Sequence, residues 1–123
     1  MADCHEALLR AFRRDVLTKG FRETHSPMPT FRPDIFAERT SANGLVLEQV
    51  AVEAEIQSTI FSEHTSHQLL KMDEFVRHQS RKQIRVRAFL LVPRQKAACA
   101  YAKSLLAALF PGGTSIRLEQ EPC

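Results

Sequence analysis

Residues 45–56 form a long and mostly apolar strand candidate that carries two acids near its end. Successive side chains of a strand point to opposite faces of a sheet, so Glu53, Glu55 and Gln57 share one face. The other face then receives Val50, Val52, Ala54 and Ile56. Acids have low strand propensity, and like charges placed side by side repel. A bound divalent cation would explain the two acids; the alternative is that they are ordinary strand residues.

A shorter strand is predicted just before this run, over residues 34–38, where it opens after Pro33. The Asn-Gly pair at 43–44 lies between the two strands and is a typical β-hairpin signal. Strands joined by a hairpin are antiparallel neighbours. We therefore expect Asp34, at the start of the shorter strand, to lie close to the acids of the longer one.

These carboxylates form a candidate metal site. Mg²⁺ takes oxygen ligands, commonly one or two carboxylates together with water and substrate phosphate. Asp34 and Glu53 are the minimal ligand pair, and Glu55 is either a third ligand or the group that orients or deprotonates the attacking water. The register leaves a second choice open, in which Glu55 and Gln57 are the working pair and Glu53 lies outside the ligand shell.

The remaining pattern predicts a single α/β domain over residues 1–123, with a mixed central sheet flanked by helices. Apolar residues at helical spacing predict a helix over residues 3–19, a second that starts near Thr65, and a third over residues 98–109. The spacing from Thr65 to Gln68 fits a capping box. Further strands are predicted over residues 21–24, 84–92 and 114–118.

Composition and cysteine use indicate the class of protein and the compartment to expect. With 44% hydrophobic and 25% charged residues, this is an ordinary globular composition. Cys4, Cys99 and Cys123 are widely spaced and contain no CxxC pair, so we expect reduced thiols and no cysteine zinc site. No apolar run has the length of a membrane span, and residues 1–26 lack the apolar segment of a signal peptide. A cytoplasmic protein without a membrane partner is expected.

The charges are unevenly distributed along the chain. The net charge is +3, but residues 75–118 contain no Asp or Glu. A basic surface next to an acidic pocket suits a polyanion whose phosphates also need a metal, which favours nucleic acid as the partner. The alternative is a solvated basic face that balances an acidic one. The candidate nucleic-acid contacts are Arg81, Lys82, Arg85 and Arg87.

The arrangement resembles the PD-(D/E)XK nuclease superfamily, which has the restriction-endonuclease-like fold. Pro33-Asp34 matches the Pro-Asp of its signature, and Glu53-Ala54-Glu55 matches its acid-x-Lys, with Glu55 in place of the usual lysine. The resemblance implies an αβββαβ core, here with an added C-terminal helix and strand. It also implies Mg²⁺ or Mn²⁺ held by the first two acids, and hydrolysis of phosphodiester bonds in DNA. Some restriction enzymes of the superfamily use an acid at the lysine position.

Three further positions resemble variants of that superfamily. Gln68 matches the glutamine of a Gln-x-x-x-Tyr helix, with Met72 in place of the tyrosine. Gln68 is therefore a candidate site residue, unless it only caps its helix. Lys71 can replace the missing catalytic lysine, unless it is a solvated surface residue. Glu6 can reach the metal from the first helix, unless it is an exposed acid favoured by the helix dipole.

Other chemistries have weaker signals. His64 and His67 are three residues apart and adjoin Glu63, a spacing that allows zinc binding, but exposed histidines at a helix start are the simpler interpretation. The chain has no Gly-rich phosphate loop and no Gly-x-Ser-x-Gly nucleophile motif. The second functional hypothesis is a nuclease-like module that lost its chemistry and binds nucleic acid or protein. An active form is expected to work as a homodimer, because cleavage of a duplex needs two sites.

Overall fold

The computed structural model describes residues 3–17 and 19–123. In chain order, its elements are α1 (Cys4–Asp15), β1 (Arg22–Glu23), β2 (Ile35–Thr40), β3 (Val46–Ala54), α2 (Glu63–Arg81), β4 (Arg85–Pro93), α3 (Lys96–Leu109) and β5 (Arg117–Glu121). The strands form one five-stranded sheet in the order β1-β2-β3-β4-β5. The first three strands are antiparallel, whereas β3, β4 and β5 run parallel. The predicted α/β class, with a mixed sheet flanked by helices, is confirmed.

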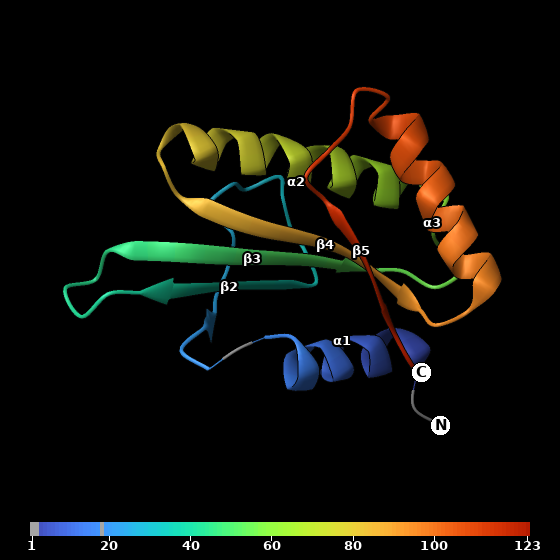
Figure 1. Ribbon diagram of the computed structural model, residues 1–123, viewed down its shortest axis with the longest axis horizontal. Helices are drawn as coiled ribbons and strands as arrows, with labels where there is room; N and C mark the ends of the chain where they lie inside the picture. The colour runs from blue at the N-terminus through green and yellow to red at the C-terminus, as the bar shows by residue number, and fades with distance from the viewer. Residues whose placement is uncertain (1–2, 18) are drawn as a thin grey trace.

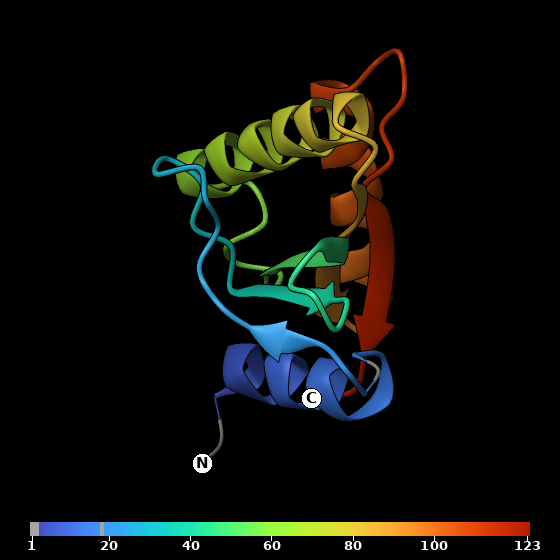
Figure 2. The ribbon, with the colours of Figure 1, turned by 90° about the vertical axis from the view of Figure 1, so that its left-hand side faces the viewer.

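The molecule has three layers, with α1 on one face of the sheet and α2 and α3 on the other (Figures 1 and 2). Alternation along the strands supplies both cores, because neighbouring side chains point to opposite faces. On the α1 side, Leu8 and Phe12 pack against Val50 and Val52. The core under α2 and α3 consists of Phe31, Phe36, Ala51, Ile60, Leu69, Met72, Phe75, Ala88, Leu90, Val92, Ala98, Ala102, Leu105 and Ile116.

The predicted hairpin joins β2 to β3. Gly44 has a φ of 86°, a left-handed conformation that glycine adopts without the steric cost that a Cβ brings. Ile35 pairs with Val52 in the register, so the preceding Asp34 lies beside the carboxyl end of β3. The helix α2 then carries the chain back to β4, which pairs with β3 in parallel. The carboxyl ends of β3 and β4 therefore meet at one edge, the position where open α/β sheets commonly bind ligands.

Two element boundaries differ from the sequence prediction. The N-cap of α2 is Ser62, whose hydroxyl accepts from the Thr65 N–H, so the predicted capping box at Thr65 is wrong. Thr65 lies in the first turn and is fully buried, and its hydroxyl donates to the Thr59 carbonyl. The last strand is Arg117–Glu121 and not 114–118, because the Thr114 hydroxyl bonds to Asp73 before the chain joins β4. The first helix ends at Asp15; Thr18, within its predicted range, lies outside the described residues.

The expectation of reduced thiols is wrong for two of the cysteines. Cys4 and Cys123 form a disulfide across a sequence separation of 119 residues, and Cys99 is free. The C-terminus accordingly lies beside α1 (Figure 1). The spacing of the cysteines could not indicate this pair, because β5 brings the chain end to α1 only in the folded sheet. No helix within residues 3–17 and 19–123 is long and apolar enough to cross a bilayer.

Candidate functional site

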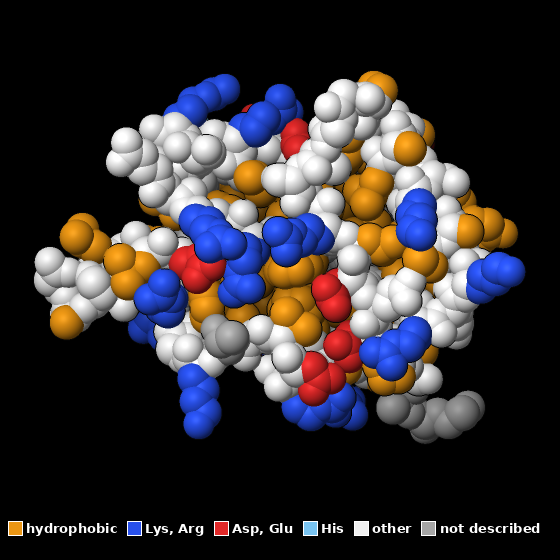
Figure 3. Space-filling model, in the orientation of Figure 1, with side chains coloured by type: hydrophobic (Ala, Val, Ile, Leu, Met, Phe, Trp, Pro, Cys, Tyr) orange, Lys and Arg blue, Asp and Glu red, His pale blue; other side chains and the backbone are white. Residues whose placement is uncertain are grey.

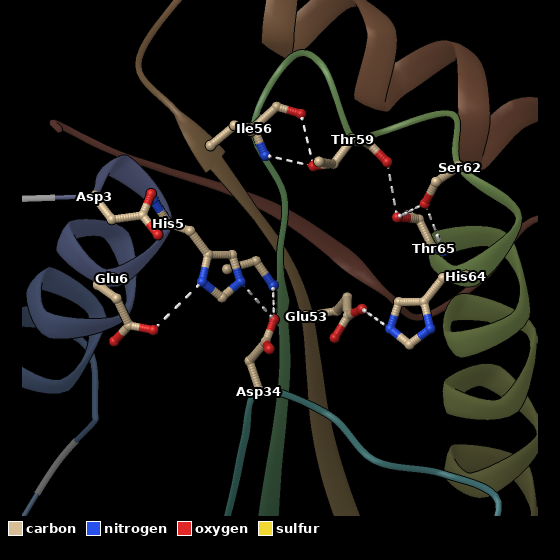
Figure 4. Close-up of polar contacts among 11 residues, drawn as sticks. Asp3, His5, Glu6, Asp34, Glu53, Ile56, Thr59, Ser62, His64 and Thr65 are labelled. Carbon is tan, nitrogen blue, oxygen red and sulfur yellow. Dashed lines mark hydrogen bonds and ion pairs between the residues drawn. The ribbon is translucent and has the colours of Figure 1, made fainter.

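The predicted carboxylates line one pocket at the carboxyl end of β3, with a volume of about 360 Å³. Its lining residues are Asp3, His5, Asp34, Glu53, Glu55, Ile56, Thr59, Ser62 and His64. They come from the first turn of α1, the start of β2, the end of β3 and the first turn of α2. Figure 4 shows Asp34 and Glu53 between His5 on one side and His64 on the other.

Glu53 is the buried centre of this pocket. Its side chain lies on the sheet face covered by α2, and the residue is only 2% exposed. Burial raises the pKa of Glu53 to about 10, and the charges of Asp34 and Glu55, with their hydrogen bonds to its protonated form, add to the shift. At neutral pH and without a bound cation, Glu53 is therefore protonated. Glu55 is also buried, and its N–H extends the ladder by donating to the Leu91 carbonyl.

Asp34 is held in place by two partners on the same oxygen. Its Oδ2 accepts from the Ala54 N–H at 2.8 Å and lies 3.3 Å from Nε2 of His5. The other ring nitrogen of His5 lies 3.7 Å from Glu6. Sequence reasoning assigned no role to His5, because it is 29 residues from Asp34 and follows no ligand spacing. Its only local signal is its place beside Asp3, the N-cap of α1.

Glu53 has a second histidine partner. Nε2 of His64 lies 3.9 Å from Oε2 of Glu53, and the His64 side chain is 73% exposed, against 3% for Glu53. This contact joins the end of β3 to the first turn of α2. The predicted zinc site instead combined His64 with His67 and Glu63. His67, one turn further along α2, is exposed and does not line the pocket. The structure therefore places His64 toward the carboxylates and leaves His67 on the surface.

The donor chemistry of the pocket fits a hard divalent cation, because three carboxylates converge there and a cation would offset the burial of Glu53. The positions of the side chains, however, do not yet match this donor chemistry. Within residues 3–17 and 19–123, no three His, Cys, Asp or Glu side chains form a group that could hold a metal ion. Asp34 lies 3.3 Å from Nε2 of His5, and Glu53 lies 3.9 Å from Nε2 of His64.

The other predicted site residues lie around this pocket and not within it. Oε1 of Gln68 accepts from the Arg32 N–H at 3.0 Å, so Gln68 ties α2 to the segment that leads into Asp34. Lys71 pairs with Glu74 at 3.6 Å and does not line the pocket. Glu6 is exposed and touches His5, through which it is linked to Asp34.

The predicted basic contacts lie at the end of α2 and in the first part of β4. Arg81 ends the 19-residue helix α2, whose first turn borders the carboxylate pocket, and such a helix is about 28 Å long. Arg85 begins β4, whose far end borders the pocket. Arg87 pairs with Glu48 at 3.0 Å. Arg81 and Lys82, at the end of α2, therefore lie away from the carboxylate pocket, and the assignment of these residues as nucleic-acid contacts stays a prediction.

Comparisons with known proteins return no relative of this chain. No family model matches it, and neither a curated protein nor a solved structure matches it. The resemblance to the PD-(D/E)XK superfamily accordingly stays a prediction.

Proposed function

We propose that this protein is a divalent-metal-dependent nuclease that hydrolyses phosphodiester bonds in DNA. The observation that carries the proposal is the convergence of Asp34, Glu53 and Glu55 on one pocket at the carboxyl end of β3. Asp34 and Glu53 would hold Mg²⁺ or Mn²⁺. When bound, such a cation neutralises charge on the phosphate and lowers the pKa of water.

Each residue at the carboxylate pocket has a separate task in this proposal. The Ala54 N–H and His5 orient the Asp34 carboxylate through one oxygen, which leaves Oδ1 for a ligand. Glu53 must lose its proton before it can act as a ligand, because its pKa is about 10. Glu55 orients the attacking water or accepts its proton, the role that lysine has in the family signature. Gln68 is a positioning residue that fixes the segment before Asp34.

A second function is favoured by a different observation. Among the described residues, no lysine lines the carboxylate pocket, and a protonated Glu53 is satisfied without any metal. Both facts suit a nuclease-like module that binds nucleic acid or protein and has no activity. If the substrate is a duplex, we propose that the active form is a homodimer, since a single site cuts one strand. A cytoplasmic location stays a prediction, and the Cys4–Cys123 disulfide counts against it because stable disulfides are rare in the cytosol.

Cleavage assays test the proposal directly. The protein is incubated with single-stranded, duplex and branched DNA and with RNA, each with Mg²⁺ or Mn²⁺. We expect DNA cleavage that is lost in Asp34→Asn and Glu53→Gln. The matched control is Glu63→Gln, an acid on the first turn of α2 that does not line the pocket. Binding without cleavage in every metal condition would overturn the nuclease in favour of the inactive module.

A further inference from the structure

A second pocket adjoins the carboxylate pocket. Its volume is about 450 Å³, and it is lined by Cys4, Ile56, Gln57, Ser58, Pro93, Gln95 and Tyr101. Ile56 lines both pockets, so they lie on either side of the segment that leaves β3. The side chains of Gln57 and Gln95 carry amides, which can both donate and accept hydrogen bonds. This second pocket therefore offers hydrogen-bonding groups and an aromatic ring directly beside the carboxylates.

A third pocket continues from the second and is basic. It has a volume of about 400 Å³ and shares Gln95 with the second pocket. Arg94, Lys96 and Lys103 line it, and none of its described lining residues is an Asp or Glu. Lys96 and Lys103 are seven residues apart on α3, which places them on one face of that helix. On the face in Figure 3, Lys and Arg side chains lie over α3, at the right, without acids among them.

An exposed aromatic pair lies beside these pockets. The rings of Phe61 and Tyr101 have centroids 5.3 Å apart and planes inclined by 51°, and the residues are 57% and 40% exposed. Large aromatic residues exposed in this way are common stacking platforms for nucleic-acid bases, since every base has a π-face. Phe61 immediately precedes Ser62, which lines the carboxylate pocket, so the pair adjoins both pockets.

We propose that the three pockets form one binding track for single-stranded nucleic acid. A base stacks on Tyr101 and meets the amides of Gln57 and Gln95, and the neighbouring phosphates bind Lys96 and Lys103. The track then delivers the adjoining phosphodiester bond to the carboxylates, a step that rests on the proposed nuclease function. A single strand suits this track because its bases are open to an aromatic side chain, whereas those of a duplex are stacked and paired.

The proposed track lies away from the candidate contacts that the distribution of charge along the chain suggests. Arg81 and Lys82 lie at the end of α2 remote from the carboxylates, whereas Lys96 starts the helix that follows the carboxyl end of β4. The start of α3 also carries no acid in its first turn, and Gln95 makes no side-chain cap there. Free backbone N–H groups at this end add to the attraction for phosphate.

Binding is measured with the full chain and a fluorescently labelled oligo-dT, by anisotropy in EDTA so that no cleavage occurs. The charge variant is Lys96→Ala/Lys103→Ala, and its matched control is Arg81→Ala/Lys82→Ala. We expect the control to bind like the wild type. The charge variant should bind at least tenfold more weakly, and the slope of log affinity against log salt should fall by about 0.7 for each lost phosphate contact.

The stacking step has its own variants. Tyr101→Ala should weaken binding by about tenfold without changing the salt slope, since stacking is worth roughly 1–3 kcal/mol per base. Tyr101→Phe keeps the ring and should bind like the wild type. Oligo-U has the same phosphates and bases of the same kind, so equal binding of RNA supports the track. Circular dichroism of each variant checks that it is folded.

Several results would overturn the track. The first is that the wild type does not bind oligo-dT. The second is that it binds a duplex more tightly than a single strand of equal length. The third is that the Arg81/Lys82 control loses as much affinity as the Lys96/Lys103 variant. The two proposals fail separately. Binding that needs Lys96, Lys103 and Tyr101, with no cleavage in Mg²⁺ or Mn²⁺, keeps the track and removes the nuclease. Cleavage that persists in the Lys96/Lys103 variant at low substrate concentration keeps the nuclease and removes the track.

Discussion

Replacing Glu53 with glutamine should change how the stability of this protein depends on pH. Glutamine has nearly the same size and shape as a protonated glutamic acid, and its amide can also donate a hydrogen bond to Asp34 or Glu55. Glu53→Gln therefore preserves the packing at this 2%-exposed position while removing its ionisation. The difference in free energy of unfolding between the two proteins then reports the electrostatics of the pocket.

The sign follows from the direction of the shift. The pKa of Glu53 is raised from 4.5 to about 10, so the folded protein binds a proton that the unfolded chain releases above pH 4.5. The stability contributed by this proton is fully present below 4.5 and is lost as the pH rises toward about 10. One pKa unit corresponds to about 1.4 kcal/mol, so the loss between pH 5 and pH 8 is on the order of 4 kcal/mol.

Urea denaturation in EDTA, repeated at pH 5, 6, 7 and 8, measures this difference. We expect Glu53→Gln to gain stability over the wild type by about 1.4 kcal/mol for each pH unit. Glu63→Gln, which alters an exposed acid, should give a curve parallel to that of the wild type. Equal slopes for Glu53→Gln and the wild type would contradict this prediction, because they would mean that Glu53 does not hold a proton in the folded state.

Two further predictions concern the cation and the disulfide. Mg²⁺ should raise the melting temperature of the wild type more at pH 8 than at pH 6, because the cation competes with the proton on Glu53. Differential scanning fluorimetry measures this shift in melting temperature. The Glu53→Gln variant should show no such shift. Removing the disulfide in Cys4→Ser/Cys123→Ser should lower the free energy of unfolding by about 5 kcal/mol, because the disulfide closes a loop across 119 residues. Urea denaturation measures this loss of stability. The control is Cys99→Ser, which alters the free cysteine.

These two predictions have clear contrary results. A Mg²⁺-induced shift that is equal at both pH values, or that persists in Glu53→Gln, would show that the ion binds elsewhere. A disulfide variant as stable as the wild type, or a free thiol count of three in the purified protein, would show that Cys4 and Cys123 are not paired.

Much of the sheet and the position of the carboxylates were predictable from local pattern. Alternation along residues 45–56 is enough to put Glu53 on the face opposite Val52, because a strand has a period of two. The Asn-Gly turn made β2 and β3 antiparallel neighbours, which brought Asp34 to the end of β3. Both inferences use local patterns, namely the alternation of one strand and one short turn. A short segment of chain has few alternative conformations, so such patterns can be read directly.

Other features depended on packing between distant segments. The contact of His5 with Asp34 spans 29 residues, and the contact of His64 with Glu53 arises only when α2 docks on the sheet. The position of Arg81 relative to the carboxylates depends on the length of α2 and its packing on the sheet, which the distribution of charge along the chain does not give.

Strand periodicity and one turn are thus enough to predict that three carboxylates share one end of a sheet. Their surroundings depend on how distant elements pack together. This packing set the burial that keeps Glu53 protonated, the contact of His5 with Asp34, the contact of His64 with Glu53, and the basic pocket beside α3. Such contacts join elements that no local pattern links, so they follow from the close packing of side chains in the folded core.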